Sequence, residues 1–115
     1  MTLYISMKVE GNYVFFLVKG RRFYWEQVRR IVCLLMSVGL GRISTDTFRK
    51  ILRGEPYSGG IPPAPPEGLI LWRIKTKIDD NFVEIEDRER IRERIVREVK
   101  KAILSAKWTF PRREK

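Results

Sequence analysis

The side chains that could do chemistry in this 115-residue chain are those of Asp, Glu, Lys, Arg and Tyr, because it has no His and one Cys. The absence of histidine excludes Ser/His/Asp and Cys/His nucleophilic sites and the HExxH zinc helix. A lone Cys33 excludes an internal disulfide and a cysteine-rich metal cluster, and it suits a reducing compartment. We therefore expect no metal site, and chemistry that rests on carboxylates and cations.

The balance of charge favours a polyanionic partner. Lys and Arg outnumber Asp and Glu by 24 to 14, which gives a formal charge of +10. Such an excess attracts polyanions, of which nucleic acid is the commonest in a cell. The basic side chains that we take as candidates for RNA contacts are Arg30, Arg42, Lys107, Arg112 and Arg113. The alternative is that a basic domain is merely soluble.

The C-terminal segment 107–115 mixes aromatic and basic residues. Trp108 and Phe110 alternate with cations there, a composition suited to stacking on bases while neutralising phosphates. The other expectation is a frayed and solvated terminus.

No export or membrane signal is visible in the sequence. The longest apolar run covers residues 31–36, far short of the roughly 18 residues that a membrane span needs. The N-terminus lacks the basic and apolar pattern of a signal peptide. We expect a cytoplasmic protein without a membrane partner.

The N-terminal residues predict a β-hairpin. Apolar residues alternate with others from 3 to 9, which is typical of a strand with one buried face. Residues 10–12 predict a turn, and the β-branched and aromatic run 13–18 predicts a second, more central strand. Two later strands are expected at 69–78 and 82–85.

Helical spacing begins at residue 23 and extends to 38, with a nearly all-apolar stretch that predicts a helix inside the core. Phe23, Tyr24 and Trp25 are expected mainly to pack at its start, with base stacking as the alternative. Gly39 and Gly41 are expected to end it.

Two more helices are expected further along the chain. Ser44 is expected to cap a shorter helix that ends at Gly54. Asp87 opens a long helix whose apolar stripe is Ile91, Ile95, Val99 and Ile103.

Residues 55–68 contain five prolines and three glycines, which predicts a long, stiffened loop. The expected order is ββααββα in a single α+β domain over residues 1–115. We expect a mainly antiparallel sheet with helices packed on one face.

Three blocks of sequence carry a resemblance. Residues 23–32 are similar to the pattern Phe-Leu-x-x-Met-Val-Arg-x-Ile-Val, residues 38–44 form the second block, and residues 64–71 are similar to Ala-Pro-Pro-x-Gly-Leu-x-Leu. In this order, behind a two-strand hairpin, they resemble the C-terminal half of the tRNA pseudouridine synthase A family over about residues 3–78. Gln27 replaces the usual Met, and Cys33 stands where Gly is usual.

The resemblance implies a pseudouridine-synthase-like α/β domain over residues 1–86, followed by a basic helix and tail. The family isomerises uridine in tRNA, in or near the anticodon stem-loop, by detaching the base from C1′ and rejoining it through C5. It needs no cofactor and pairs into dimers. Its catalytic aspartate lies in an Arg-Thr-Asp-Ala-Gly motif of the N-terminal half.

This chain lacks that motif. Thr45-Asp46 is the only similar dipeptide, but it lies at a helix start, where a short acid favours the helix dipole. The resemblance therefore implies a chain that is inactive alone and needs the N-terminal half, in cis or as a separate chain.

Arg29 matches the family arginine that pairs with the catalytic aspartate. Its helix face also carries Trp25 and Val32, so we expect its charge to be partly buried and to need an acid from elsewhere. Arg30 follows Glu26 by four residues, which predicts a local surface pair, although Glu26 could also reach Arg29. The alternative is an ordinary arginine whose head group extends to solvent.

Leu69 and Leu71 resemble the apolar wall of the family's uracil pocket, and plain strand core is the alternative. Two other functions stay open: a non-catalytic RNA-binding module and a dimerisation domain derived from the same fold.

Overall fold

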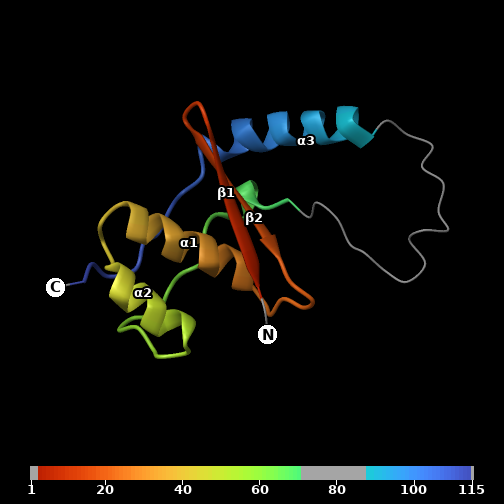
Figure 1. Ribbon diagram of the computed structural model, residues 1–115. Coiled ribbons are helices and arrows are strands. Elements are labelled where there is room, and N and C mark those ends of the chain that lie inside the picture. The colour runs from red at the N-terminus through yellow and green to blue at the C-terminus, as the bar shows by residue number, and fades with distance from the viewer. Residues whose placement is uncertain (1–2, 71–87, 115) are drawn as a thin grey trace. The chain divides into compact units, whose positions relative to one another are not determined.

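The computed structural model describes residues 3–70 and 88–114 (Figure 1). The element order is β1 (Tyr4–Glu10), β2 (Tyr13–Lys19), α1 (Gln27–Gly39), α2 (Thr45–Leu52), the 3-10 turn η1 (Pro66–Gly68) and α3 (Arg88–Ile103). The chain divides into two compact units. The first comprises Met1–Ala64 with Thr109–Lys115, and the second comprises Pro65–Trp108.

The expected α+β class is confirmed at this level, because the described residues contain an antiparallel two-stranded sheet and three α-helices. The predicted strand at 82–85 lies outside the described residues. So does the predicted strand at 69–78 beyond its first two residues, which adopt no regular structure. The full ββααββα order and the single domain stay predictions.

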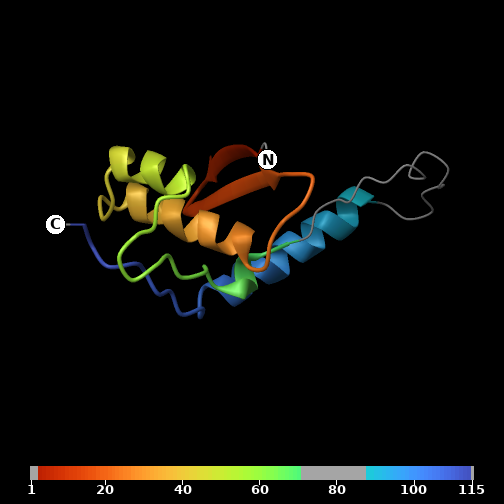
Figure 2. The same cartoon turned by 90° about the horizontal axis from the view of Figure 1, so that it is seen from below.

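The predicted hairpin is confirmed. β1 and β2 pair antiparallel from Tyr4 opposite Lys19 to Glu10 opposite Tyr13. Gly11 has a φ of 60° in the connecting turn, a conformation that glycine adopts without steric cost. The hairpin lies beside α1 in both views (Figures 1 and 2).

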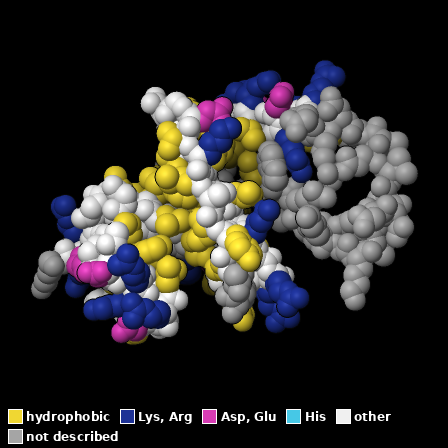
Figure 3. Space-filling view, viewed as in Figure 1, with side chains coloured by type: hydrophobic (Ala, Val, Ile, Leu, Met, Phe, Trp, Pro, Cys, Tyr) yellow, Lys and Arg dark blue, Asp and Glu magenta, His cyan; other side chains and the backbone are white. Residues whose placement is uncertain are grey.

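The predicted burial of β1 is wrong. Ile5, Met7 and Val9 are all exposed, although their alternation is that of a buried strand face. β2 is half-buried at Phe15 and Phe16. A strand face is buried only where a second layer covers it, and the described part of the first unit leaves β1 uncovered. Hydrophobic side chains accordingly gather on the surface over the hairpin (Figure 3).

Helix α1 supplies most of the core. Ile31, Cys33, Leu34 and Ser37 are buried on it. The hydroxyl of Ser37 donates a hydrogen bond to the Cys33 carbonyl at 2.7 Å, so this buried polar group is satisfied.

The boundaries of α1 differ in part from the prediction. The helix begins at Gln27 rather than at residue 23, because Glu26 is left-handed, with a φ of 57°, and interrupts the helical path. Gly39 is the last helical residue, and the left-handed stop is Gly41, with a φ of 73°.

The prediction for α2 is confirmed. The hydroxyl of Ser44 accepts a hydrogen bond from the Thr47 backbone N–H at 3.2 Å, which satisfies one of the free donors at a helix start. Gly54, with a φ of 96°, follows the C-cap residue.

In the second unit, α3 begins at Arg88, and Asp87 lies outside the described residues. The predicted stripe is buried only in part: Ile91 and Ile95 are exposed, whereas Val99 and Ile103 are half-buried. Ile103 lies against η1, where a Cβ added to Gly68 would come within 3.1 Å of it. Among the helices of the described ranges, none is long and apolar enough to span a bilayer.

Candidate functional site

Arg29 lies in the first turn of α1 and is held by the proline-rich loop. Its side chain is 22% exposed, which agrees with the expected partial burial. Its Nε donates a hydrogen bond to the Ala64 carbonyl at 2.7 Å, and the Ala64 N–H donates to the Arg29 carbonyl at 2.9 Å. One loop residue is thus bonded through both of its backbone groups to one arginine.

Glu26 bridges two arginines. Its Oε2 atom lies 3.7 Å from Nη1 of Arg29 and 3.8 Å from Nη2 of Arg30, and its side chain is 14% exposed. Glu26 therefore reaches both arginines, an option that the sequence left open, and the pairing of Arg29 with an acid from elsewhere stays a prediction. Both distances exceed the roughly 2.7–2.9 Å of a charge-assisted hydrogen bond, so these contacts are ion pairs only.

Arg30 is bonded to the same loop. Its Nη1 donates a hydrogen bond to the Ile61 carbonyl, and its side chain is 43% exposed. Ile61 and Ala64 each precede a proline, which holds them extended. Because proline has no N–H, the loop does not form a regular series of backbone hydrogen bonds. Its carbonyls accept hydrogen bonds from the arginine side chains of α1 instead.

The arrangement suits recognition of an anion. The Nε of Arg29 is fixed by Ala64, and in the described part of the chain its Nη2 makes no hydrogen bond. A planar guanidinium with free Nη donors pairs with a carboxylate or a phosphate. Within the described ranges, no cluster of acidic or cysteine side chains could hold a metal ion.

The structure places the two leucine candidates differently. Leu69 follows η1 in extended backbone and is exposed. Leu71 lies outside the described residues. Their assignment to a uracil pocket stays a prediction.

The C-terminal segment 109–114, which we call the tail, is docked rather than frayed, and the expectation of a solvated end is wrong for these residues. Cys33 Sγ donates to the Thr109 carbonyl at 3.5 Å, and the Tyr57 hydroxyl donates to the Arg112 carbonyl at 2.6 Å. Pro111 is buried. The tail therefore belongs to the packing of the first unit.

Among the RNA-binding candidates, Arg42 faces the tail. Its Nη2 donates to the Pro111 carbonyl at 2.8 Å, and its guanidinium lies 5.6 Å from the centre of the Phe110 ring. Arg112 and Arg113 are exposed on the tail, and Lys107 is exposed in the second unit. The structure does not test their contact with RNA.

Glu114 is a structural residue that the sequence did not indicate. Its carboxylate accepts hydrogen bonds from the Ser44 backbone N–H at 2.6 Å and from the Thr47 hydroxyl. These bonds lower the pKa of Glu114, and the bond from Thr47 has the largest effect. The partners lie about 70 residues away along the chain, so no local pattern could have revealed them.

Two other groups have structural roles. Asp46 is exposed and pairs with Arg49 at 3.2 Å one turn along α2, which fits the expected helix-start role. Burial raises the pKa of the Cys33 thiol, so Cys33 is unsuited to act as a nucleophile near neutral pH.

Comparison with known proteins identifies the class. The family model for tRNA pseudouridine synthase matches residues 2–76, and the chain belongs to this family. Curated relatives named tRNA pseudouridine synthase A include one from Thermococcus kodakarensis, 49% identical over 64 residues, which are 56% of this chain and 24% of the relative. Another, from Methanococcus maripaludis, is 42% identical over 88 residues, 71% of this chain and 33% of the relative.

A more distant relative, from Archaeoglobus fulgidus, is 34% identical over 97 residues, 79% of this chain and 36% of the relative. The chain thus spans about a quarter to a third of the length of the curated relatives that it matches. No solved structure matches it.

Proposed function

We propose that this chain supplies the arginine-bearing part of a tRNA pseudouridine synthase active site, with Arg29 as the partner of a catalytic aspartate. The aspartate comes from a segment that the relatives contain and this chain does not match, in cis or as a separate chain. The observation that carries the proposal is the hold on Arg29, whose Nε is fixed at 2.7 Å by Ala64 while Nη2 stays free among the described contacts.

The role of Arg29 follows from its charge and geometry. A guanidinium beside a carboxylate favours the ionised form, so the aspartate is ready to act as nucleophile or base at neutral pH. The bond from Nε to Ala64 restricts rotation of the guanidinium plane, so the free Nη2 faces a defined direction. The partial burial of Arg29 strengthens the pairing by keeping water away.

The remaining parts of the proposal concern the substrate. The tRNA presents a uridine of the anticodon stem-loop region, and Leu69 and Leu71 form an apolar surface for the unstacked base. The basic side chains that contact phosphates are Arg30, Arg42, Lys107, Arg112 and Arg113. No cofactor takes part, the protein forms a dimer, and it acts in the cytoplasm.

The test is a complementation assay. The chain is mixed with the aspartate-bearing segment of a relative such as that of Thermococcus kodakarensis, and conversion of uridine to pseudouridine in a tRNA transcript is measured. We expect Arg29→Gln to lower the rate by at least about a hundredfold, as loss of a stabilising donor in an active site does. Arg49→Gln, on the exposed face of α2, is the matched control and should retain the rate.

Two results would count against the proposal. Full activity of Arg29→Gln would refute the role of this residue. Binding of tRNA without conversion in any mixture would instead support a non-catalytic RNA-binding module.

A further inference from the structure

The segment between β2 and α1 exposes two large aromatic side chains. Trp25 is 84% exposed and Tyr24 is 65% exposed, although the sequence predicts that both pack at a helix start. Arg21 and Arg22 precede them and are exposed as well. Removing so much aromatic surface from water would be favourable, so its exposure needs an explanation.

Local hydrogen bonds fix the segment in this conformation. The Tyr24 N–H donates to the Gln27 side-chain oxygen at 2.9 Å, and the Gln27 N–H donates to the Tyr24 carbonyl at 3.0 Å. The left-handed Glu26 follows directly. The two aromatic residues therefore lie on an ordered turn, where they stay exposed.

The start of the segment is packed against the hairpin. A Cβ added to Gly20 would lie 2.7 Å from the Leu3 side chain and 3.0 Å from the Phe23 ring, so a larger residue here would force a neighbouring side chain to move. Phe23 lies against Gly20 just after β2 and is 40% exposed. Tyr24 and Trp25 are the more exposed members of the aromatic triplet.

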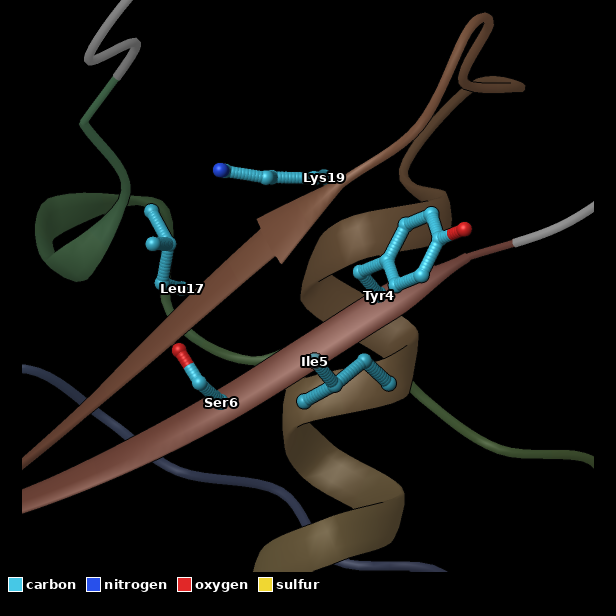
Figure 4. Close-up of a pocket in the computed structure, with 5 residues that line it drawn as sticks. All are labelled: Tyr4, Ile5, Ser6, Leu17 and Lys19. Carbon is cyan, nitrogen blue, oxygen red and sulfur yellow. The ribbon is translucent and has the colours of Figure 1, made fainter.

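A groove on the hairpin adjoins this segment. It has a volume of about 490 Å³ and is lined by Tyr4, Ile5, Ser6, Leu17 and Lys19 (Figure 4). Tyr4 and Lys19 are paired across the two strands, and Lys19 is followed by Gly20 and the exposed segment. Groove and segment therefore meet at one end of the hairpin.

The charge of this region is positive. Residues 11–45 contain six basic side chains and one acidic side chain, Glu26, and Glu26 is engaged by Arg29 and Arg30. Among the described residues, Lys19, Arg21 and Arg22 form no ion pair. Three cations are thus available next to the exposed rings.

We propose that these residues form a binding surface for unpaired RNA nucleotides, which we call the aromatic-basic surface: Tyr4, Lys19, Arg21, Arg22, Tyr24 and Trp25. Exposed rings stack on bases of any sequence, and adjacent cations neutralise phosphates. An uncharged protein partner would not use the three cations. The proposal does not depend on the role of Arg29.

The test measures binding of a labelled uridine 12-mer by fluorescence anisotropy. Tyr24→Ala with Trp25→Ala should weaken binding about five- to a hundredfold for each base that loses its stacking partner, so at least about fivefold in total. Arg21→Gln with Arg22→Gln should lower the slope of log affinity against log salt by about 1.4, because each single-strand phosphate contact contributes roughly 0.7.

Matched controls lie elsewhere on the first unit. Leu40→Ala removes an exposed apolar side chain and should leave affinity unchanged. Arg49→Gln with Arg53→Gln removes the same charge from α2 and its C-cap and should leave the salt slope unchanged. Far-UV circular dichroism checks that each variant is folded.

Two further ligands distinguish the alternatives. Inorganic polyphosphate carries charge without bases, so its affinity should not change in the aromatic variant. Equal loss of polyphosphate and oligonucleotide binding would overturn the stacking role. A second result would also overturn it: binding to phosphatidylserine vesicles that depends on Trp25, together with oligonucleotide binding that does not. The surface would then bind a membrane.

The outcome is separable from that of the proposed function. Arg29→Gln should retain oligonucleotide binding while losing conversion in the complementation assay. The aromatic variant should lose oligonucleotide affinity but retain the conversion rate when the RNA is saturating. Oligonucleotide binding that is insensitive to both Trp25 and Arg21 would refute the aromatic-basic surface and leave the role of Arg29 untouched.

Discussion

Replacement of Arg29 by methionine tests whether this residue joins α1 to the proline-rich loop. The substitution keeps an unbranched apolar stem but removes the bond from Nε to the Ala64 carbonyl, 2.7 Å long, and one of the two ion pairs of Glu26. A hydrogen bond from a charged donor contributes about 1.5–3 kcal/mol. Since Glu26 is 14% exposed, weaker pairing of its carboxylate adds to the cost.

We therefore expect Arg29→Met to lower the free energy of unfolding by about 2–4 kcal/mol. That is a large share of the roughly 5–15 kcal/mol typical of a domain. Urea denaturation at pH 7, followed by circular dichroism, measures it. With a denaturant slope of about 2 kcal/mol per molar, the middle of the usual range, the midpoint should fall by about 1–2 M.

Two matched substitutions set the scale. Arg30→Met removes a similar set of contacts from a side chain that is 43% exposed, and about 1 kcal/mol is expected. Arg49→Met breaks an exposed pair with Asp46 and should cost under about 0.5 kcal/mol. If Arg29→Met cost no more than Arg49→Met, the contact with Ala64 would not stabilise the fold and the reasoning would fail.

Three further predictions concern the core and the tail. Because the pKa of Glu114 is lowered in the folded protein, its carboxylate stabilises the fold above the unfolded-state pKa. This stabilisation is lost as the pH falls through the folded-state pKa, below about 4.5. Glu114→Gln should therefore reduce the loss of stability at acid pH, and an unchanged loss would contradict the role of Glu114. Ile43 is 2% exposed, so Ile43→Ala should cost about 2–5 kcal/mol and Ile43→Val about 0.5–1.5, as measured by urea denaturation; equal costs would argue against tight packing. The buried Cys33 thiol, with its raised pKa, should react with a disulfide reagent far more slowly in the native protein than in urea, and equal rates would show that it is accessible.

The features that sequence could predict are local ones. The turn at Gly11 and the cap at Ser44 follow from residue types that act within a few positions. The partial burial of Arg29 follows from its helix face. Its bond to Ala64 could not be predicted, because the loop position is set by packing 35 residues away.

The predictions that failed depend on layers and distant contacts. The alternation in β1 indicates a strand. Burial of its apolar face also needs a second element that packs on it, and the alternation does not show where such an element lies. Glu26 gives no sign of a left-handed backbone, which costs a non-glycine residue about 1–2 kcal/mol and here shortens α1. The tail meets Cys33 and Tyr57 across 76 and 55 residues, beyond the reach of any periodicity.

The two anchor points on α1 have a consequence for the way the chain can vary. The chain leaves the first unit just after Ala64, which is bonded to Arg29, and returns at Thr109, which is bonded to Cys33. Arg29 and Cys33 are one helical turn apart, so their Cβ atoms lie about 5–6 Å from each other. Residues 65–108 are thus an insertion whose two ends are held close together on one helix face. Insertions with adjacent ends can lengthen, shorten or be exchanged without disturbing their host, so a change of length within residues 65–108 should leave the contacts of Arg29 and Cys33 in the first unit intact.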